Sequence, residues 1–345
     1  MRRAKVRAPP APGKTLRFDS RRARHDVSPH AAPPRVTASD ARHTPASAPR
    51  WLVLTAFGLV YVLWGSTYLA IRIAIETMPP FLMAGLRFLI AGGIVYAWAR
   101  WRGAARPARA HWRSAFIIGA LLLMLSNGGV TWAEQFVPSG ITSLLVCTVP
   151  LWMVVLDWLF FGGERPTPGV ALGVVLGLAG VVVLIGPDEI AHGGGVDLAG
   201  AAVLLAAPVF WAVGSLWSRH ATLPESPLLA IGMEMLGGGA LLVLLGLLTG
   251  EAARVHPAAV SARSVAALLY LIVFGALIGF TAYLWLLRVT TAAKVSTHSF
   301  VNPVIAVFLG WAILGEPVTM RTILASVIII AAVALITLTR VRARS

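Results

Sequence analysis

From Trp51 to Thr339 the chain is a succession of apolar runs about 20 residues long, separated by short polar steps. In lipid, a helix satisfies its own backbone hydrogen bonds, and about 20 residues of helix cross the hydrocarbon core. Runs such as 170–185 and 323–338 carry no polar face at helical spacing, which disfavours a soluble bundle. Only 12% of residues are charged, against about 25% in soluble domains. We therefore predict an all-α integral membrane protein.

The polar steps divide the apolar sequence into ten expected transmembrane helices. They cover residues 52–74, 81–99, 114–134, 139–161, 169–186, 197–217, 228–249, 265–287, 294–314 and 322–339. Basic residues gather on alternate loops, and the opposite loops hold only Arg254, Arg263 and Arg321. Because positive loops stay in the cytoplasm, both termini are predicted to be cytoplasmic, with the chain spanning a bacterial inner (plasma) membrane several times.

A basic segment, residues 1–50, precedes the first span and is rich in Arg, Pro and Ala. It cannot bury a core, so we expect a disordered cytoplasmic tail. Three interpretations stay open: a tail that touches anionic lipid heads, an arm that binds another partner, or translation from a start codon set too far upstream. The net charge of +15 does not predict nucleic-acid binding, because the charges follow a membrane topology.

One segment of the chain occurs twice, as TVPLWMVVLDWLFFGGE at 148–164 and as NPVIAVFLGWAILGE at 302–316. A second correspondence has Trp64 and Arg87 at the same separation as Trp211 and Glu234. These matches predict a duplication, with repeats at 51–186 and 197–339 and a cytoplasmic end at 340–345. Five spans per repeat is an odd number, so the second repeat enters the membrane inverted. Inverted repeats place a binding site at their interface, near the midplane.

The repeat puts a proline near the middle of two spans, Pro150 and Pro303. A proline inside a helix frees the carbonyl four residues earlier, here those of Val146 and Ser299. Such a carbonyl must face protein or a water-filled cavity. Either these prolines mark a substrate site or they are structural kinks relieved by neighbouring hydroxyls. Polar side chains within about a turn of them are Thr148, His298 and Asn302.

Ionisable residues inside spans are costly and usually functional. Arg87 is a candidate substrate ligand, and we expect it to meet Glu134. Glu234, expected to meet Lys294 or Arg288, is a proton-coupling candidate together with His298, because burial can shift the pKa of either group. The alternative is that these side chains snorkel to the interface or are simply hydrogen-bonded.

Aromatic side chains could line an amphipathic cavity, and the repeat singles out Trp64 and Trp211, with Tyr68 nearby. For most aromatic residues, packing is the alternative. Glycines at small-residue spacing are expected to allow close helix contact; they are Gly173, Gly177, Gly180, Gly275 and Gly279. The single cysteine, Cys147, is interpreted as a small core residue.

Several motifs are missing from the sequence. There is no GxxxxGK[ST], so no nucleotide hydrolysis is expected to power the chain. The absence of HExxH, a Cys–His cluster and GxSxG predicts no metal, no cofactor and no enzymatic activity.

Five short stretches resemble one family: WGSTYLAIRIA at 64–74, PPFLMAGLRF at 79–88, VPSGI at 137–141, EML at 234–236 and VNPVIAV at 301–307. They are similar to the EamA-domain members of the drug/metabolite transporter superfamily, in particular YedA-type exporters. The resemblance covers about residues 51–340 and implies an inner-membrane exporter of small metabolites or drug-like compounds. The long basic tail departs from that family's short amino terminus.

The sequence thus predicts a secondary active transporter that exports a small organic solute by alternating access, with protons as the coupling ion and lipids as surroundings. One alternative is an amino-acid or nucleoside exporter of narrow specificity. Another, from a different class, is a membrane scaffold acting through its basic tail. A homodimer is left open.

Overall fold

The computed structural model describes residues 49–185, 198–290, 292–295 and 297–342. The predictions for the basic tail, for the loop 186–197 and for the last three residues lie outside this part. Every regular element within it is helical.

The first half contains helices that are interrupted in three places. The elements are α1 (Arg50–Gly65), α2 (Thr67–Ala74), α3 (Pro80–Trp101), α4 (Arg109–Gly119), the π-helix η1 (Ala120–Asn127), α5 (Gly128–Ala133), α6 (Ser139–Val146), α7 (Val149–Phe160) and α8 (Pro168–Ile185). Pro80 begins α3 and Pro168 begins α8, where a proline costs no helical hydrogen bond.

The second half follows a similar order. Its elements are α10 (Leu198–Ser218), α11 (Pro227–Leu248), the 3₁₀ turns η2 (Glu251–Arg254) and η3 (Pro257–Ala259), α12 (Ala262–Tyr270), the π-helix η4 (Leu271–Ile278), α13 (Gly279–Val289), α14 (Ala292–Val295), α15 (His298–Leu314) and α16 (Met320–Arg342). Each half therefore carries a π-helix of eight residues in its third apolar segment.

Eight helical segments among the described residues are long and apolar enough to cross a membrane. Two shorter apolar helices, Pro168–Leu184 and His298–Leu314, occupy the remaining expected positions. The all-helical membrane prediction is confirmed, whereas these two helices fall short of the length that the other eight reach.

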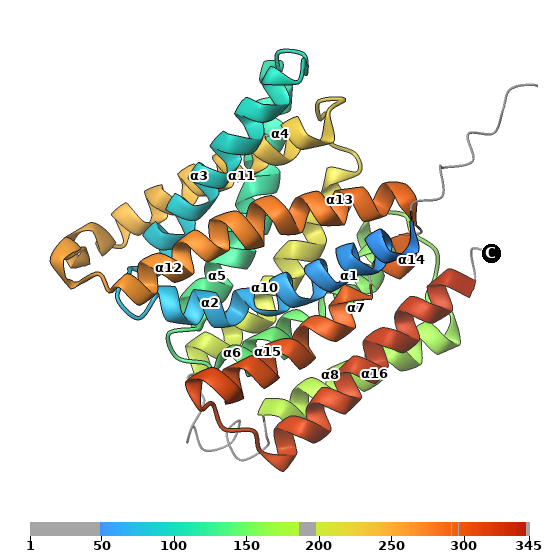
Figure 1. Ribbon diagram of the computed structural model, residues 1–345. Helices are drawn as coiled ribbons and strands as arrows, with labels where there is room; N and C mark the ends of the chain where they lie inside the picture. Colours follow the sequence, from blue (N-terminus) through green and yellow to red (C-terminus); the bar gives the residue numbers. More distant parts are fainter. Residues whose placement is uncertain (1–48, 186–197, 291, 296, 343–345) are drawn as a thin grey trace, which may run out of the picture. The chain divides into compact units, whose positions relative to one another are not determined.

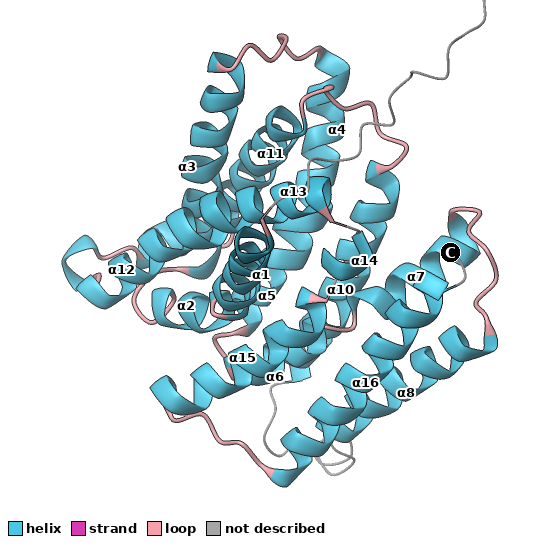
Figure 2. Ribbon diagram, turned by 45° about the vertical axis from the view of Figure 1, so that its right-hand side comes forward, coloured by secondary structure: helices cyan, strands magenta, loops and turns pink. Residues whose placement is uncertain are grey.

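The helix contacts keep the same pattern when the two halves are exchanged. Second segment packs on second (α3 on α11), fourth on fourth (α6 on α15) and fifth on fifth (α8 on α16). The first segment of each half packs on the third of the other, because α1 and α2 contact α13 and α12 while α10 contacts η1 and α5. Figures 1 and 2 show the α8–α16 pair and the α3–α11 pair lying side by side in both views.

Glycine allows α3 and α11 to approach closely. A Cβ at Gly92 would lie 2.9 Å from the Leu236 nitrogen and 3.0 Å from the Gly232 oxygen, so only glycine fits. The predicted glycine contacts are also confirmed, since Gly173 and Gly180 face α16, and Gly177, Gly275 and Gly279 face Leu151, Thr67 and Trp64. These contacts position the helices that carry the polar residues described next.

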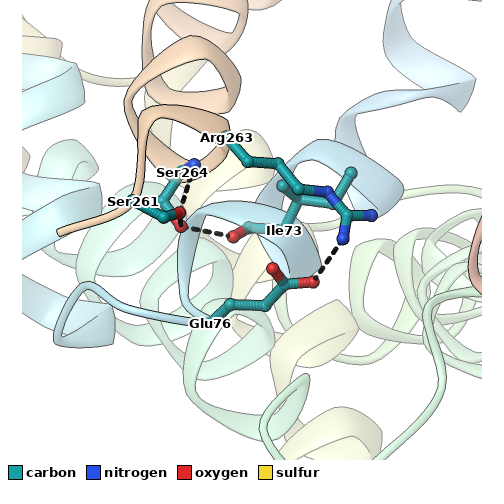
Figure 3. A network of polar contacts seen from close by, with 5 residues as sticks. All are labelled: Ile73, Glu76, Ser261, Arg263 and Ser264. Carbon is teal, nitrogen blue, oxygen red and sulfur yellow. Dashed lines mark hydrogen bonds and ion pairs between the residues drawn. The ribbon is translucent and has the colours of Figure 1, made fainter. Parts of the chain in front are cut away.

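A small polar network joins the end of α2 to the start of α12 (Figure 3). Ser264 donates its hydroxyl to the Ile73 carbonyl at 2.9 Å, and Arg263 pairs with Glu76 at 3.6 Å. The Ser261 hydroxyl accepts from the Ser264 nitrogen at 3.0 Å and caps α12. The network links the first segment of one half to the third segment of the other.

Candidate functional site

The fourth apolar segment is broken where the sequence repeat places its first proline. α6 ends at Val146 and α7 begins at Val149, and the Thr148 hydroxyl donates to the Leu145 carbonyl at 2.6 Å. Pro150 lies in the first turn of α7, where its missing N–H costs little. Our expectation of a proline kink inside one continuous helix is therefore wrong at Pro150, because the helix stops before it.

In the ninth segment the proline lies inside a helix. α14 ends at Val295 and α15 begins at His298, and Pro303 is buried within α15. Pro303 cannot donate to the Ser299 carbonyl, as the sequence predicts. The buried Cys147 thiol supplies the donor instead, at 2.9 Å. The break between α6 and α7 thus contacts the first turn of α15.

Aromatic side chains pack around His298 at this contact. The His298 ring lies edge-on to Trp64 and Tyr283, with centroid distances of 5.0 and 5.8 Å. The Trp64 indole N–H donates to the Gly275 carbonyl of the π-helix η4 at 3.2 Å. His298 is itself fixed by a hydrogen bond of 2.9 Å between Nδ1 and the Val295 carbonyl. The histidine therefore sits where α1, α13 and α15 meet.

Asn302 holds α1 against the start of α15. Its amide, with the nitrogen turned toward the two acceptors, donates to the carbonyls of His298 at 3.0 Å and Tyr61 at 3.3 Å. The Tyr61 hydroxyl also bonds the Thr297 hydroxyl. We call this region the helix-break site, defined by Trp64, Cys147, Thr148, Tyr283, His298, Ser299, Asn302 and Pro303. It brings together Trp64, Thr148, His298, Asn302 and Pro303 with Tyr283 and with the Ser299 carbonyl that Pro303 frees, and it adds Cys147, which the sequence alone suggests is core packing.

A second group of polar residues, the buried charge cluster, consists of the buried Arg87 and Glu134 and the half-buried Tyr68, Arg72 and Glu316. Arg87 is 5% exposed, donates to the Asn127 side chain at 2.9 Å and lies 4.2 Å from the Phe88 ring centroid. Glu134 is fully buried. The expected pairing of Arg87 with Glu134 is wrong as a direct contact, because Arg87 forms no ion pair with any described side chain and bonds Asn127 instead.

Two carboxylates bind the first N–H groups of helices in the first half. Glu316 accepts from Ser139 and Gly140 at 2.8 and 3.1 Å, and Glu251 accepts from Phe81 and Leu82 at 3.2 and 2.9 Å. The first N–H groups of a helix lack internal partners, and the helix dipole favours an anion there. Both helices follow a proline that offers no capping side chain. That missing cap is a sequence signal from which a distant acceptor could have been predicted.

Two predicted site residues lie elsewhere. Trp211 is half-buried on α10 and Glu234 is half-buried on α11, and neither contacts the helix-break site through a described bond or ring contact. Glu234 forms no ion pair with a described side chain, and the side chain of Arg288 lies outside the described part. The repeat relates Trp64 to Trp211 in sequence, and their helices α1 and α10 pack against the third and fourth segments of the opposite halves.

Two cavities are lined by residues outside the helix-break site. An apolar one of about 200 Å³ is lined by α3, α11, η4 and α13, including Trp98, Leu277 and Phe280, and the Phe280 ring packs against Trp64 of the helix-break site at a centroid distance of 5.5 Å. A more polar one of about 290 Å³ is lined by Glu164, Arg165, Asp157 and Arg219, and the last two form an ion pair at 3.6 Å. In the part of the chain that the structure describes, no cluster of His, Cys, Asp and Glu could hold a metal ion.

The chain is similar to known membrane transporters over most of its length. It is 38% identical over 290 residues to the uncharacterized inner membrane transporter YedA of Escherichia coli strain K12, covering 83% of this chain and 92% of that protein. It is 28% identical over 284 residues to the uncharacterized transporter YoaV of Bacillus subtilis, covering 81% and 94%. A solved crystal structure of a protein with 24% identity superposes with a TM-score of 0.57, covering 84% of this chain and 98% of that one, which shows the same fold.

The family comparison divides the chain at the same place as its internal repeat. The EamA-like transporter family matches twice, over residues 50–186 and 198–338. Together these ranges cover nearly all of the described helices. The chain is therefore a membrane transporter that belongs to the EamA-like transporter family.

Proposed function

We propose that this protein is a secondary active transporter that exports small organic solutes across the inner membrane by alternating access, coupled to proton antiport. In this proposal ten spans form two inverted five-helix repeats, at 51–186 and 197–339, with both termini in the cytoplasm. The observation that carries it is the contact between the break that separates α6 from α7 and the first turn of α15, where Cys147 meets the Ser299 carbonyl freed by Pro303. Inverted-repeat transporters bind solutes between such discontinuous helices.

The chemistry of the helix-break site favours a solute that is partly aromatic or apolar. Trp64 and Tyr283 offer ring faces, while Thr148, His298 and Asn302 offer polar groups within the same region. These groups come from both repeats. In the proposed cycle, the contact between the repeats opens to one side of the membrane and then to the other. Tyr68, Arg87 and Pro150 complete the proposed substrate path, and His298 and Glu234 remain proton-coupling candidates.

The proposal is tested by uptake into inverted membrane vesicles, in which export appears as accumulation. A panel of amino acids, nucleosides and cationic drugs is offered with and without an acid lumen. We expect at least one class to accumulate only when the gradient is present. Accumulation of amino acids or nucleosides alone would identify the narrow-specificity exporter instead, and no gradient dependence would contradict proton antiport.

Site variants locate the solute in the same assay. Trp64→Ala and His298→Ala should each lower uptake about tenfold, because each removes ring contacts at the helix-break site. Trp211→Ala is the matched control, since Trp211 has no described bond or ring contact with that site, and it should retain most of the uptake. Equal loss in all three variants, at equal amounts of inserted protein, would contradict this location. A variant lacking residues 1–48 should still transport, whereas a scaffold acting through its tail would lose its function.

A further inference from the structure

Glu134 is a buried carboxyl group that the helix-break site does not use. It follows α5 directly, one residue beyond the third apolar span, and is fully buried. Neither of its carboxylate oxygens has a hydrogen-bond partner among the described residues. It lies at the end of the helices where α2 and α5 finish and α3 and α6 begin, which we call the Glu134 end. A buried, ionised carboxylate without hydrogen bonds is very costly.

Charged side chains and one tyrosine, from several elements, lie near Glu134. Glu316 approaches from the loop after α15, Tyr68 and Arg72 from α2, and Arg87 from α3. Burial first, and then the negative charge of Glu316, raises the pKa of Glu134 well above its ordinary value, while Arg72 and Arg87 act in the opposite direction. Neither arginine forms an ion pair with the Glu134 carboxylate, and one amino group of Arg87 donates to the Asn127 side chain instead.

The surroundings distinguish Glu134 from its acidic neighbour. Glu316 accepts two backbone N–H groups at the start of α6, whereas Glu134 accepts no hydrogen bond from a described residue. An ionised carboxylate that is buried without hydrogen bonds is costly, and a second carboxylate nearby adds to that cost. Glu134 meets both conditions and is therefore the carboxyl group that retains a proton.

We infer that Glu134 is a proton-binding site that takes up a proton as the Glu134 end closes and releases it when that end opens to water. The step is protonation of a carboxylate to a carboxylic acid: the proton comes from water at the Glu134 end as that end closes, and it returns to water there when the end reopens. Closure removes water from Glu134, and the Glu316 and Glu251 caps hold α6 and α3 in the closed arrangement. The transport role of Glu134 rests on the proposed function. The proton-binding site itself rests on the burial of Glu134 and on its lack of hydrogen-bond partners among the described residues.

Infrared titration of the full-length protein in lipid tests the site directly. The carboxylic acid C=O band of the wild type should persist at pH values well above the ordinary titration range of a glutamic acid and disappear as the pH rises further. Glu134→Gln should lose this band, and the conservative Glu316→Gln should shift its titration to lower pH, because it removes the neighbouring negative charge. Glu234→Gln is the control for a membrane carboxyl outside the cluster. An unchanged band in Glu134→Gln would overturn the inference.

The pH dependence of stability gives a second measurement. Because the folded-state pKa of Glu134 is raised, its contribution is present at low pH, below the unfolded pKa, and is lost as the pH rises through the folded pKa. The melting temperature of the wild type should therefore fall with rising pH across this window, relative to Glu134→Gln. Parallel curves for the two proteins would overturn the inference.

Transport measurements separate this inference from the proposed function. If a gradient drives wild-type uptake and Glu134→Gln loses that dependence, proton binding at Glu134 is required for the gradient to drive uptake. If a gradient drives uptake equally in Glu134→Gln, the transport role inferred for Glu134 is overturned while proton-coupled export stands. If the carboxyl band titrates as expected but no gradient drives the wild type, proton antiport is wrong and the proton site is retained.

Discussion

At the residue scale, the most informative contact joins Cys147 to Ser299. The sequence shows that Pro303 frees the Ser299 carbonyl, but it does not show which group satisfies it. The donor is 152 residues away in the chain and comes from the other broken segment. A residue expected to be ordinary core packing thus takes part in a polar contact between the two halves.

Replacing Cys147 by Val should destabilise the protein by about 1 kcal/mol, because it removes the donor and leaves a buried carbonyl unpaired. Cys147→Ser keeps a donor and is the matched control. In a Pro303→Ala background the backbone regains an N–H at that position, which can bond the Ser299 carbonyl, so the same Cys147→Val change should cost close to nothing. Thermal unfolding in detergent measures all of these proteins, and an equal cost of Cys147→Val in both backgrounds would contradict the contact.

At the element scale, close helix contacts and distant helix caps fix where the polar residues lie. Glycines allow α3 and α11 to approach closely. The Glu251 carboxylate, which follows α11, accepts from the Phe81 and Leu82 N–H groups at the start of α3. The Glu316 cap does the same for α6. Each cap joins the second half of the chain to a helix of the first half, so it both stabilises a helix and links the repeats.

The glycines of α3 provide a test of this packing with a control one residue away. Gly92→Ala should destabilise the protein by about 1–3 kcal/mol, because its Cβ would overlap the α11 backbone. A Cβ added at Gly93 would meet nothing within 4 Å, so Gly93→Ala should be neutral or stabilise by about 0.5–1 kcal/mol. Unfolding midpoints in detergent compare the two, and similar values would mean that α3 and α11 are not in close contact.

At the scale of the whole molecule, the reciprocal helix contacts support the proposal of two related halves. The first and third segments of each half exchange partners, while the second, fourth and fifth meet their counterparts. The two π-helices fall in corresponding segments. Such a pattern suits two repeats that move against each other, and the arrangement of charged loops favours opposite orientations in the membrane.

Cysteine labelling tests this inverted arrangement. In a Cys147→Ser background, Thr77→Cys and Glu225→Cys each place one exposed thiol in the loop after the first segment of a repeat. A membrane-impermeant thiol reagent applied to intact cells should label Thr77→Cys and not Glu225→Cys, with the reverse result in inverted vesicles. Labelling of both thiols from the same side would contradict inversion, and Ala253→Cys serves as a second external marker.

The sequence by itself determined that the chain is helical, apolar and built from a repeated unit, because the length of apolar runs and the period of a repeat are local properties. It also identified Trp64, Thr148, His298, Asn302 and Pro303, since prolines and polar groups inside apolar segments are conspicuous. Only the tertiary structure decided that Pro150 lies in the first turn of a helix, that Arg87 bonds Asn127, and that Glu134 is fully buried without a hydrogen-bond partner among the described residues. These outcomes depend on which helices pack together, and side-chain contacts between residues far apart in the chain leave no periodic signal in the sequence.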